Sequence, residues 1–266
     1  MFDSIAGDYD ALNHILSLDV DKIWRKKALK QIVDAPAPAR VLDLACGTGD
    51  FSIAIAKALS RSHKRVGTPI EAHVKAPAKA PVEAQVTSTG FVTGDSGRSD
   101  LMTKGHVTGV DLSEGMLAVM REKVAKAGLT EMISIEEGDG EILRFPDNTF
   151  DRVTIAFGIR NFENREKGLR EMLRVLKPGG RLVILELSRP ENKVIRWFYD
   201  LYFLHILPKI GGKVSGDKAA YAYLPASVAA FPGKKAFMAT MREAGFRTVT
   251  HKAFTLGICR MYTGEK

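Results

Sequence analysis

The segment DLACGTGDFS at 43–52 constrains the fold more than any other part of the chain. It directly follows the apolar residues Val41 and Leu42, and a buried strand that runs through a glycine turn into a helix is typical of nucleotide-binding α/β folds. Two features separate it from a dinucleotide motif. Ser52 stands where the third glycine of G-x-G-x-x-G would be, and the stretch 51–65 contains no acidic residue. The turn therefore predicts a parallel α/β sheet whose ligand is still to be identified.

The rest of the chain alternates strands with helices. Periodic apolar residues predict helices at 50–59, 113–127 and 165–176, and LKPGGR at 176–181, with its Pro and Gly stop signals, is expected to end the last of them and lead into a strand. Short apolar runs predict strands, of which the last two are expected to pair antiparallel. The fold class is therefore α/β, a doubly wound, mostly parallel seven-stranded sheet, with helical covers at 1–34 and 191–243. The expected strands are 40–45, 106–110, 133–136, 151–156, 181–187, 246–251 and 256–263.

One segment interrupts this alternation. Residues 60–105 contain three prolines, few large apolar residues and the linker-like tract KAPAKAPVEA. Because so long a loop is uncommon inside a compact domain, we interpret it as a flexible insertion with a small hairpin at 84–95. A lid or partner-binding element is the alternative.

Composition limits the class of protein. The 266 residues are 45% hydrophobic, which suits one domain over 1–266 with a sizeable core. No apolar run reaches the roughly 18 residues that a bilayer span needs, and MFDSIAGDYD lacks the apolar centre of a secretory signal. The two cysteines, Cys46 and Cys259, form neither a disulfide framework nor a metal-ligand spacing. We expect a cytoplasmic protein without a metal.

The net charge of +8 permits binding to nucleic acid or to an anionic membrane surface. Dense Lys/Arg clusters are absent, and residues 60–105 alone hold seven basic against four acidic residues, so three of the eight charges lie in the insertion. The distribution predicts no nucleic-acid partner.

The acidic residue expected after the glycine turn is found at Asp111 when residues 60–105 are left out of the spacing. Asp111 follows Gly49 by 62 positions, of which 46 belong to residues 60–105. The remaining 16 positions match the sequence distance from the glycine turn to the end of the second strand in a nucleotide-binding βαβ unit. A carboxylate at that strand end can accept hydrogen bonds from both ribose hydroxyl groups.

The turn itself argues against a pyrophosphate. Asp50 opens the following helix, which suits the helix dipole but repels phosphate, and it is expected mainly as a helix N-terminal residue. Asp43, just before the turn, is placed to meet a cationic amino group, and Asp139 follows the third strand, where an adenine amino group needs an acceptor. These features favour S-adenosylmethionine. Cys46 is expected as a small buried side chain and not as a nucleophile.

Several longer motifs resemble one known family. The segments VLDLACGTGDFS, GVDLSEGML, FPDNTFDRVTIAFGIRN and LREMLRVLKPGGRLVILELSRP together resemble class I methyltransferases that C-methylate ubiquinone and menaquinone precursors. FDSIAGDYDALNHILSLDVDKIWR and YAYLPASVAAFP are similar to the same family, and FGIRN with YDALN is the most specific part. The C-terminal segment TLGICRMYTGEK and the internal segment NFENREKGLREML look closest to the menaquinone branch. The chain departs in its insertion, in its start at MFDSIA, and in Gly140, where an alanine is more usual.

The resemblance implies C-methylation of a polyprenylated hydroquinone, in this branch demethylmenaquinol to menaquinol. It implies cofactor contacts from Thr48, Asp111, Asp139, Gly140 and the backbone around Ala156, with Tyr9 closing over them. Together with the turn, the expected cofactor-binding set is Tyr9, Asp43, Gly47, Thr48, Gly49, Asp111, Leu112, Met116, Asp139, Gly140 and Ala156.

The chemistry is then an in-line displacement that needs an oriented ring, a stabilised phenolate and a proton acceptor. Arg160 and Asn161 follow the fourth strand, and Arg160 suits phenolate stabilisation or a water-holding role because its pKa is too high for a free base. A structural ion pair with Glu163 or Asp10 is its alternative. The expected catalytic set is Arg160, Asn161, Tyr223 and His14, with Asp19 a further candidate base.

The segment 193–213 is apolar and aromatic with basic ends. It predicts either a core helix or a lid that lines a prenyl channel and touches the membrane surface. Two alternative functions remain open: an O- or N-methyltransferase, and a non-catalytic cofactor-binding subunit. The oligomeric state, a homodimer included, is also open.

Overall fold

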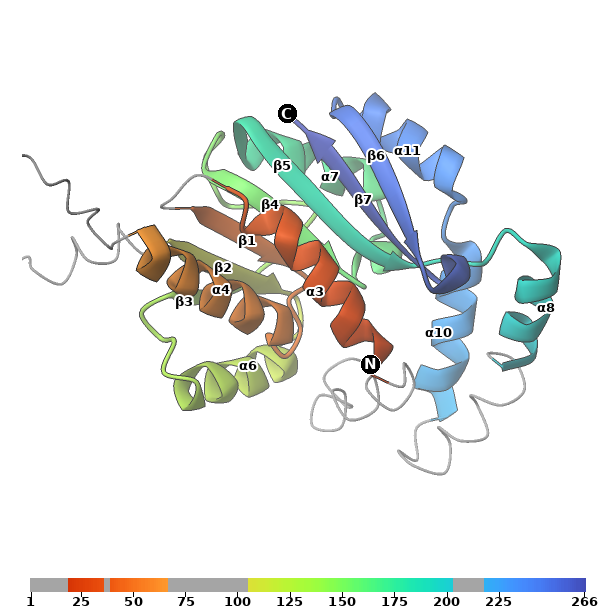
Figure 1. The fold of residues 1–266 in the computed structure, drawn as a ribbon, viewed down its shortest axis with the longest axis horizontal. Helices are drawn as coiled ribbons and strands as arrows, with labels where there is room; N and C mark the ends of the chain where they lie inside the picture. Colours follow the sequence, from red (N-terminus) through yellow and green to blue (C-terminus); the bar gives the residue numbers. More distant parts are fainter. Residues whose placement is uncertain (1–18, 36–38, 67–104, 203–217) are drawn as a thin grey trace, which may run out of the picture.

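The computed structural model describes residues 19–35, 39–66, 105–202 and 218–266 (Figure 1). Its centre is a seven-stranded sheet of order β3-β2-β1-β4-β5-β7-β6. All neighbours are parallel except β7, which runs antiparallel to β5 and β6. The expected fold class is therefore confirmed. The strands are β1 Arg40–Leu44, β2 His106–Asp111, β3 Ile133–Glu137, β4 Phe150–Ala156, β5 Leu176–Leu187, β6 Arg247–Phe254 and β7 Cys259–Glu265.

Helices cover both faces of this sheet (Figure 1). One face packs against α3 (Val20–Ile32), α4 (Asp50–Val66) and α6 (Glu114–Lys126), and the other packs against α7 (Arg165–Val175) and α11 (Lys234–Glu243). Beyond the carboxyl end of β5 lie α8 (Lys193–Leu201) and α10 (Lys218–Ala230). Two short 3₁₀ turns, η1 (Ile159–Asn161) and η3 (Thr255–Gly257), follow β4 and β6. No helix among the described residues combines the length and apolarity needed to cross a bilayer.

The sheet is apolar on both faces because helices bury each of them. Successive residues of β1 show this directly: Val41 belongs to the core under α3, α4 and α6, and Leu42 and Leu44 belong to the core under α7 and α11. This explains the nearly continuous apolar runs that predicted the strands.

Several boundaries differ from the sequence prediction. Strand β6 ends at Phe254 instead of residue 251, and β7 begins at Cys259 instead of residue 256. Helix α4 continues to Val66 instead of ending at residue 59. The helix end and following strand expected at LKPGGR are confirmed, because α7 ends at Val175, but strand β5 begins at Leu176, which pairs with Phe150, and not at residue 181. The LKPGG segment can extend because Gly179 donates its N–H to the carbonyl of Lys266, whose own N–H bonds Gly180. Some predictions concern residues outside the described part of the chain: those for 1–18, for 67–104 with the hairpin at 84–95, and for 203–217.

Candidate cofactor and substrate site

The strand order reverses between β1 and β4, and ligands of open α/β sheets bind at the carboxyl ends of the strands at such a point. The glycine turn lies there. Ala45, Gly47 and Gly49 all have positive φ, at 48°, 56° and 82°. Gly49 is required for space as well, because a Cβ at this position would collide with the side chain of Met120.

The missing third glycine has a structural explanation. Ser52 is fully buried, and its hydroxyl donates to Oδ2 of Asp43 at 2.5 Å. The room for close helix–strand packing comes instead from Gly109 on β2, where a Cβ would lie 3.3 Å from Oγ of Ser52 and 2.7 Å from Cε of Met120. The serine thus serves as a hydrogen-bond donor to a buried carboxylate, and the glycine requirement moves to the neighbouring strand.

Asp43 is the most perturbed carboxyl group of this turn. It is 1% exposed, and burial raises its pKa to about 7, against the opposing effects of the Ser52 hydrogen bond and the charge of Arg25. Its second oxygen, Oδ1, accepts no hydrogen bond from the part of the chain that the structure describes. A buried carboxylate with one unfilled oxygen is suited to a cationic partner.

Asp111 connects the turn with the second strand. It ends β2, which pairs with β1 in parallel register. Its Oδ2 accepts the N–H of Gly47 at 2.8 Å, and its Oδ1 accepts the N–H of Ser113 at 2.9 Å. The structure therefore brings Asp111 to the glycine turn, as the 16-position spacing predicted. The two backbone donors fix the orientation of the carboxylate.

The start of α4 carries a balanced charge. Asp50 is the first residue of the helix and forms an ion pair with Lys123 of α6. The same ammonium lies 3.2 Å from Oγ1 of Thr48, which is buried. Asp50 is therefore a helix N-terminal residue held by a cation, as expected.

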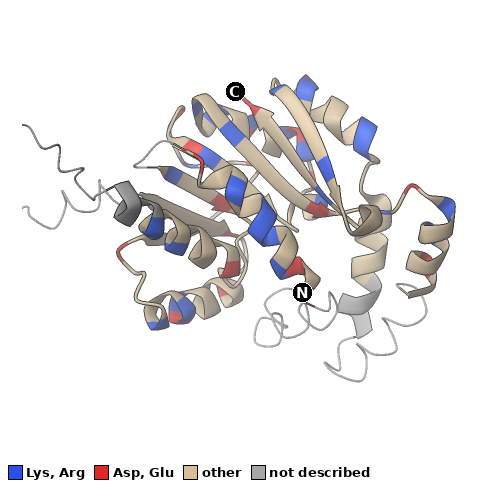
Figure 2. Ribbon diagram, viewed as in Figure 1, with Lys and Arg blue, Asp and Glu red and all other residues tan. Residues whose placement is uncertain are grey.

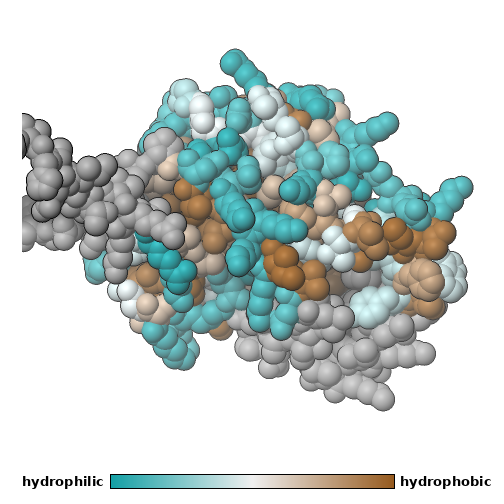
Figure 3. All heavy atoms as spheres, in the orientation of Figure 1, coloured by the Kyte–Doolittle hydropathy of each residue, from teal (hydrophilic) through white to brown (hydrophobic). Residues whose placement is uncertain are grey.

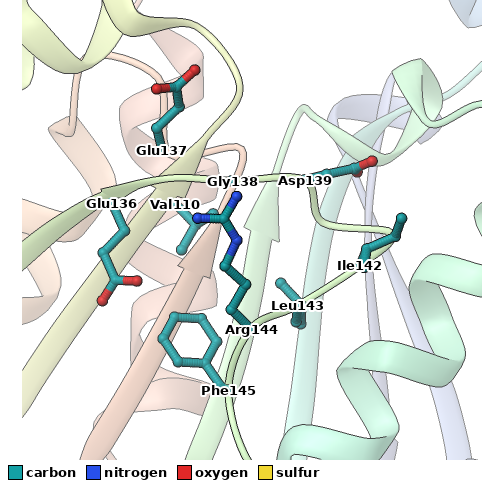
Figure 4. A pocket seen from close by; sticks show the side chains of 9 residues that line it. All are labelled: Val110, Glu136, Glu137, Gly138, Asp139, Ile142, Leu143, Arg144 and Phe145. Atoms are coloured by element: carbon teal, nitrogen blue, oxygen red, sulfur yellow. The ribbon is translucent and has the colours of Figure 1, made fainter.

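The loop after β3 places Asp139 at the neighbouring strand end. Its Oδ1 accepts the N–H of Glu141 at 2.8 Å. A shallow depression adjoins this loop (Figure 4), and Glu136 and Glu137 point to opposite sides of β3 there. Among the other expected contacts, Leu112 is exposed beside the β2 end and Met116 is buried at the start of α6.

The ring of Phe162 leaves no space for a side chain at Gly140. A Cβ at Gly140 would lie 2.5 Å from Cζ of Phe162, and a Cβ at Gly168 would meet the same ring at 2.5 Å. The ring thus packs between two glycines, and an alanine at Gly140 would require the ring of Phe162 to move.

The end of β4 is strained. Phe157 follows Ala156 with φ 62°, a conformation that bulky side chains rarely adopt and that often marks functional sites. Gly158 then approaches β1 so closely that a Cβ there would lie 2.5 Å from Cβ of Ala45. This backbone path brings the segment after β4 against the turn after β1.

Arg160 forms a buried network at the same place. Its Nη1 donates to Oε1 of Glu186 at 2.9 Å and also to the carbonyl of Phe157, and its Nε donates to Ser227 of α10 at 3.3 Å. Glu186 is 0% exposed and also accepts the N–H groups of Arg160 and Leu187. Among described residues the acidic partner is thus Glu186 and not the expected Glu163. Asp10 lies outside the described residues.

Asn161 and Tyr223 meet across the site. The hydroxyl of Tyr223, on α10, donates to Oδ1 of Asn161 at 2.9 Å, and both residues are half-buried. The structure therefore unites three of the four expected catalytic residues. His14 and Tyr9 lie outside the described residues, and Asp19 is exposed and pairs with Lys22 at 2.7 Å.

Cys46 lies half-buried in the turn, with its Sγ 3.5 Å from Sδ of Met120. Burial raises the pKa of its thiol well above the ordinary value, with the charges of Asp43 and Asp111 adding to the rise. This agrees with a packing role, because the thiolate is the reactive form.

Sequence reasoning missed Arg25, Phe157, Glu186 and Ser227. For Glu186 a signal existed, since a glutamate inside the buried run LVILEL is rarely left without a partner. For Phe157 none existed, because its positive φ is visible only in the folded backbone.

These features define a class I methyltransferase: a seven-stranded sheet with a reversed β7, and a glycine turn facing strand-end carboxylates at the switch point. A solved structure, a SAM-dependent methyltransferase from Aquifex aeolicus, has the same fold with a TM-score of 0.53. It is 19% identical and the match covers 90% of this chain and 88% of the other. At that identity the likeness concerns the fold alone.

The chain belongs to the ubiE/COQ5 methyltransferase family, whose model matches residues 1–266. It is 44% identical over its whole length to a ubiquinone/menaquinone biosynthesis C-methyltransferase UbiE from Geobacter sulfurreducens, covering 87% of that protein. It is 39% identical to a demethylmenaquinone methyltransferase from Bacteroides fragilis, covering 91% of it. The cofactor of the chain is accordingly S-adenosylmethionine.

The residues at the switch point fit this cofactor. Its amino-acid part carries an ammonium group, and Asp43 offers a buried carboxylate with an unfilled oxygen. Its ribose needs an acceptor at the end of β2, where Asp111 lies. Asp50 would oppose a pyrophosphate, which this cofactor lacks.

Proposed function

We propose that the protein transfers the methyl group of S-adenosylmethionine to a ring carbon of demethylmenaquinol and so produces menaquinol. The observation that carries this proposal is the full-length match to the family, with relatives of that name at 39% identity. The strand-end carboxylates and the absence of a third glycine support the same cofactor. The whole chain, 1–266, acts as a single catalytic domain in this proposal.

In this function the cofactor supplies an electrophilic methyl group, and the described residues hold it in place. Asp43 binds the ammonium group, Asp111 the ribose hydroxyls, and Asp139 with Gly140 the adenine. The turn residues Gly47, Thr48 and Gly49, together with Tyr9, Leu112, Met116 and Ala156, complete the contact set. Orientation of this kind accounts for several kcal/mol of a barrier, up to about 11.

The substrate faces Asn161 and Tyr223. Their hydrogen bond places a polar pair between η1 and α10, suited to orient the hydroxyl of a hydroquinone ring. The ring carbon forms a bond to the methyl carbon as the carbon–sulfur bond breaks with its electron pair on sulfur, and the ring proton then leaves to an acceptor. His14 is the candidate acceptor. Arg160 stabilises the phenolate through its charge while Glu186 holds its side chain.

Helices α8 and α10 cover the substrate in this proposal, and α8 meets the membrane. Helix α8 exposes four apolar side chains at helical spacing, Val194, Trp197, Phe198 and Leu201, of which Trp197 and Phe198 are each 61% exposed. Figure 3 shows hydrophobic atoms gathered over this helix. An amphipathic helix with aromatic residues and a nearby Lys193 suits the interface of a bilayer. A polyprenyl substrate would reach the enzyme from there, with the protein on the cytoplasmic side.

The function is tested with purified protein, demethylmenaquinol and methyl-labelled cofactor, followed by NMR of the product. We expect label on a ring carbon. Label on oxygen or nitrogen would instead identify an O- or N-methyltransferase. Absence of turnover by the isolated chain, with the cofactor bound, would favour a non-catalytic subunit.

The membrane contact is tested by sedimentation with vesicles that contain anionic lipid. We expect the Trp197→Ala/Phe198→Ala variant to lose most of its binding, and Ile23→Ala, which removes another exposed apolar side chain on α3 (54% exposed), to retain it. Equal binding by all three proteins would refute the role of α8.

A further inference from the structure

Arg25 is a cation at the cofactor turn that has no part in the proposed function. It lies on α3, which packs beside α4 and across β4 and β5. Figure 2 shows basic residues along α3 and acidic residues at its first turns. The guanidinium carbon lies 5.6 Å from the ring centre of Phe157, the strained residue after β4. Arg25 therefore reaches the space between the ends of β1 and β4.

Arg25 is held by ion pairs that are longer than hydrogen bonds. Its nearest carboxylates are Oδ2 of Asp21 at 3.6 Å from Nε and Oδ2 of Asp50 at 3.9 Å from Nη1, and both distances exceed that of a hydrogen bond. Nε is buried without an acceptor in the part of the chain that the structure describes. An arginine has five N–H groups, and a buried one without a partner costs free energy in the free protein.

Arg25 also lies near Asp43, a charged group that has an open hydrogen-bonding position. Burial raises the pKa of Asp43, and the positive charge of Arg25 acts against that rise, which places the two groups within electrostatic reach. Asp43 has a free oxygen and Arg25 has free N–H groups. A negative and a positive group, both with open hydrogen-bonding positions, complement the ammonium and the carboxylate of an α-amino acid.

We propose that Arg25 binds the carboxylate of the amino-acid part of the cofactor, opposite Asp43, which binds its ammonium group. This inference rests on the proposed function, because it assigns one more contact of the same cofactor. A guanidinium is well suited to the task because its N–H groups match the two oxygens of a carboxylate. The ring of Phe157 holds the guanidinium in position from the side of β4.

Lys123 is the competing cation at the turn. It already forms an ion pair with Asp50 and contacts Thr48 at 3.2 Å. Binding a carboxylate there would require the ammonium to give up these close contacts, whereas the ion pairs of Arg25 are longer and its Nε has no acceptor among the described residues. The structure therefore favours Arg25.

The test compares two ligands that differ in the amino-acid part. Calorimetry measures binding of S-adenosylhomocysteine, which carries the carboxylate, and of 5′-methylthioadenosine, which lacks the whole amino-acid part. The variants are Arg25→Met and Arg25→Lys, with Lys26→Met on the exposed side of the same helix as the matched control. Circular dichroism shows that each variant is folded.

We expect Arg25→Met to weaken S-adenosylhomocysteine binding by about 10- to 100-fold, the range for hydrogen bonds to charged groups. Binding of 5′-methylthioadenosine should change by no more than about twofold. Arg25→Lys should recover part of the loss, and Lys26→Met should match the unaltered protein for both ligands.

Three results would overturn the inference: an equal loss for both ligands, which would give Arg25 a structural role; no loss for either; or a selective loss in Lys123→Met with none in Arg25→Met. The proposed function fails separately if the unaltered protein binds neither S-adenosylhomocysteine nor S-adenosylmethionine.

Discussion

Replacing Asp43 by asparagine separates the demands of folding from those of ligand binding. Asp43 is 1% exposed and receives one hydrogen bond, from Ser52. The amide oxygen of asparagine can accept the same bond. The substitution therefore removes a buried negative charge and leaves most of the local packing unchanged.

The magnitude follows from proton linkage. Burial raises the pKa of Asp43 from its ordinary 3.8 to about 7. Between these values the folded state binds a proton that the unfolded state has lost, so stability falls as pH rises, by about 1.4 kcal/mol per pH unit. Below about pH 4 both states are protonated and the effect vanishes. Above about pH 7 it reaches its full size of about 4 kcal/mol.

Urea unfolding between pH 5 and 8 measures this effect. We expect Asp43→Asn to be more stable than the unaltered protein at pH 8, by up to about 4 kcal/mol, with the difference shrinking towards pH 5. Glu131→Gln, at an exposed carboxylate, should show no such trend. The variant should also bind S-adenosylhomocysteine more weakly, because the ammonium group loses its counter-charge. Identical pH dependence of stability in Asp43→Asn and the unaltered protein would refute the reasoning.

Three further substitutions test the packing and the substrate side. Gly140→Ala should lower the free energy of unfolding by about 1–3 kcal/mol through overpacking, and Phe162→Leu should restore part of it; an unchanged unfolding midpoint would contradict the contact. Glu186→Gln should cost about 3–5 kcal/mol by leaving Arg160 buried without its charge partner, and an unaltered Tm would show that the pair is not structurally important. Tyr223→Phe should lower kcat for the hydroquinone while leaving S-adenosylhomocysteine affinity unchanged by calorimetry, and a loss of that affinity would place Tyr223 at the cofactor instead.

Much of the fold could be predicted because each local signal agreed with the next. The apolar runs, the glycine turn and the alternation with helices implied parallel neighbours, and parallel neighbours place Asp43 and Asp111 at one edge of the sheet. The contact between Asp111 and Gly47 at 2.8 Å is the physical result of that register. It is unaffected by the 39 residues that lie between the end of α4 at Val66 and the start of β2 at His106.

What the sequence did not reveal depends on contacts between distant elements. LKPGG predicts the end of a helix before a strand, yet the strand already includes these residues, because Lys266 pairs with Gly179 and Gly180. Ser52 reads as a defect in a glycine motif, yet Gly109 supplies the space from another strand. Such compensations are visible only when both partners are in place.

The buried pair of Arg160 and Glu186 shows how the cofactor side and the substrate side depend on each other. One guanidinium is bonded to the carbonyl of Phe157, at the end of β4, and to Ser227 on α10. The hydrogen bond between Tyr223 and Asn161 ties the same helix to η1 a second time. Because the two ties begin at adjacent residues directly after β4, a displacement of α10 acts on the backbone that carries the strained Phe157. Helix α10 is therefore bonded twice to the segment after β4, and in the proposed reaction a ring held by Asn161 and Tyr223 is held relative to that segment.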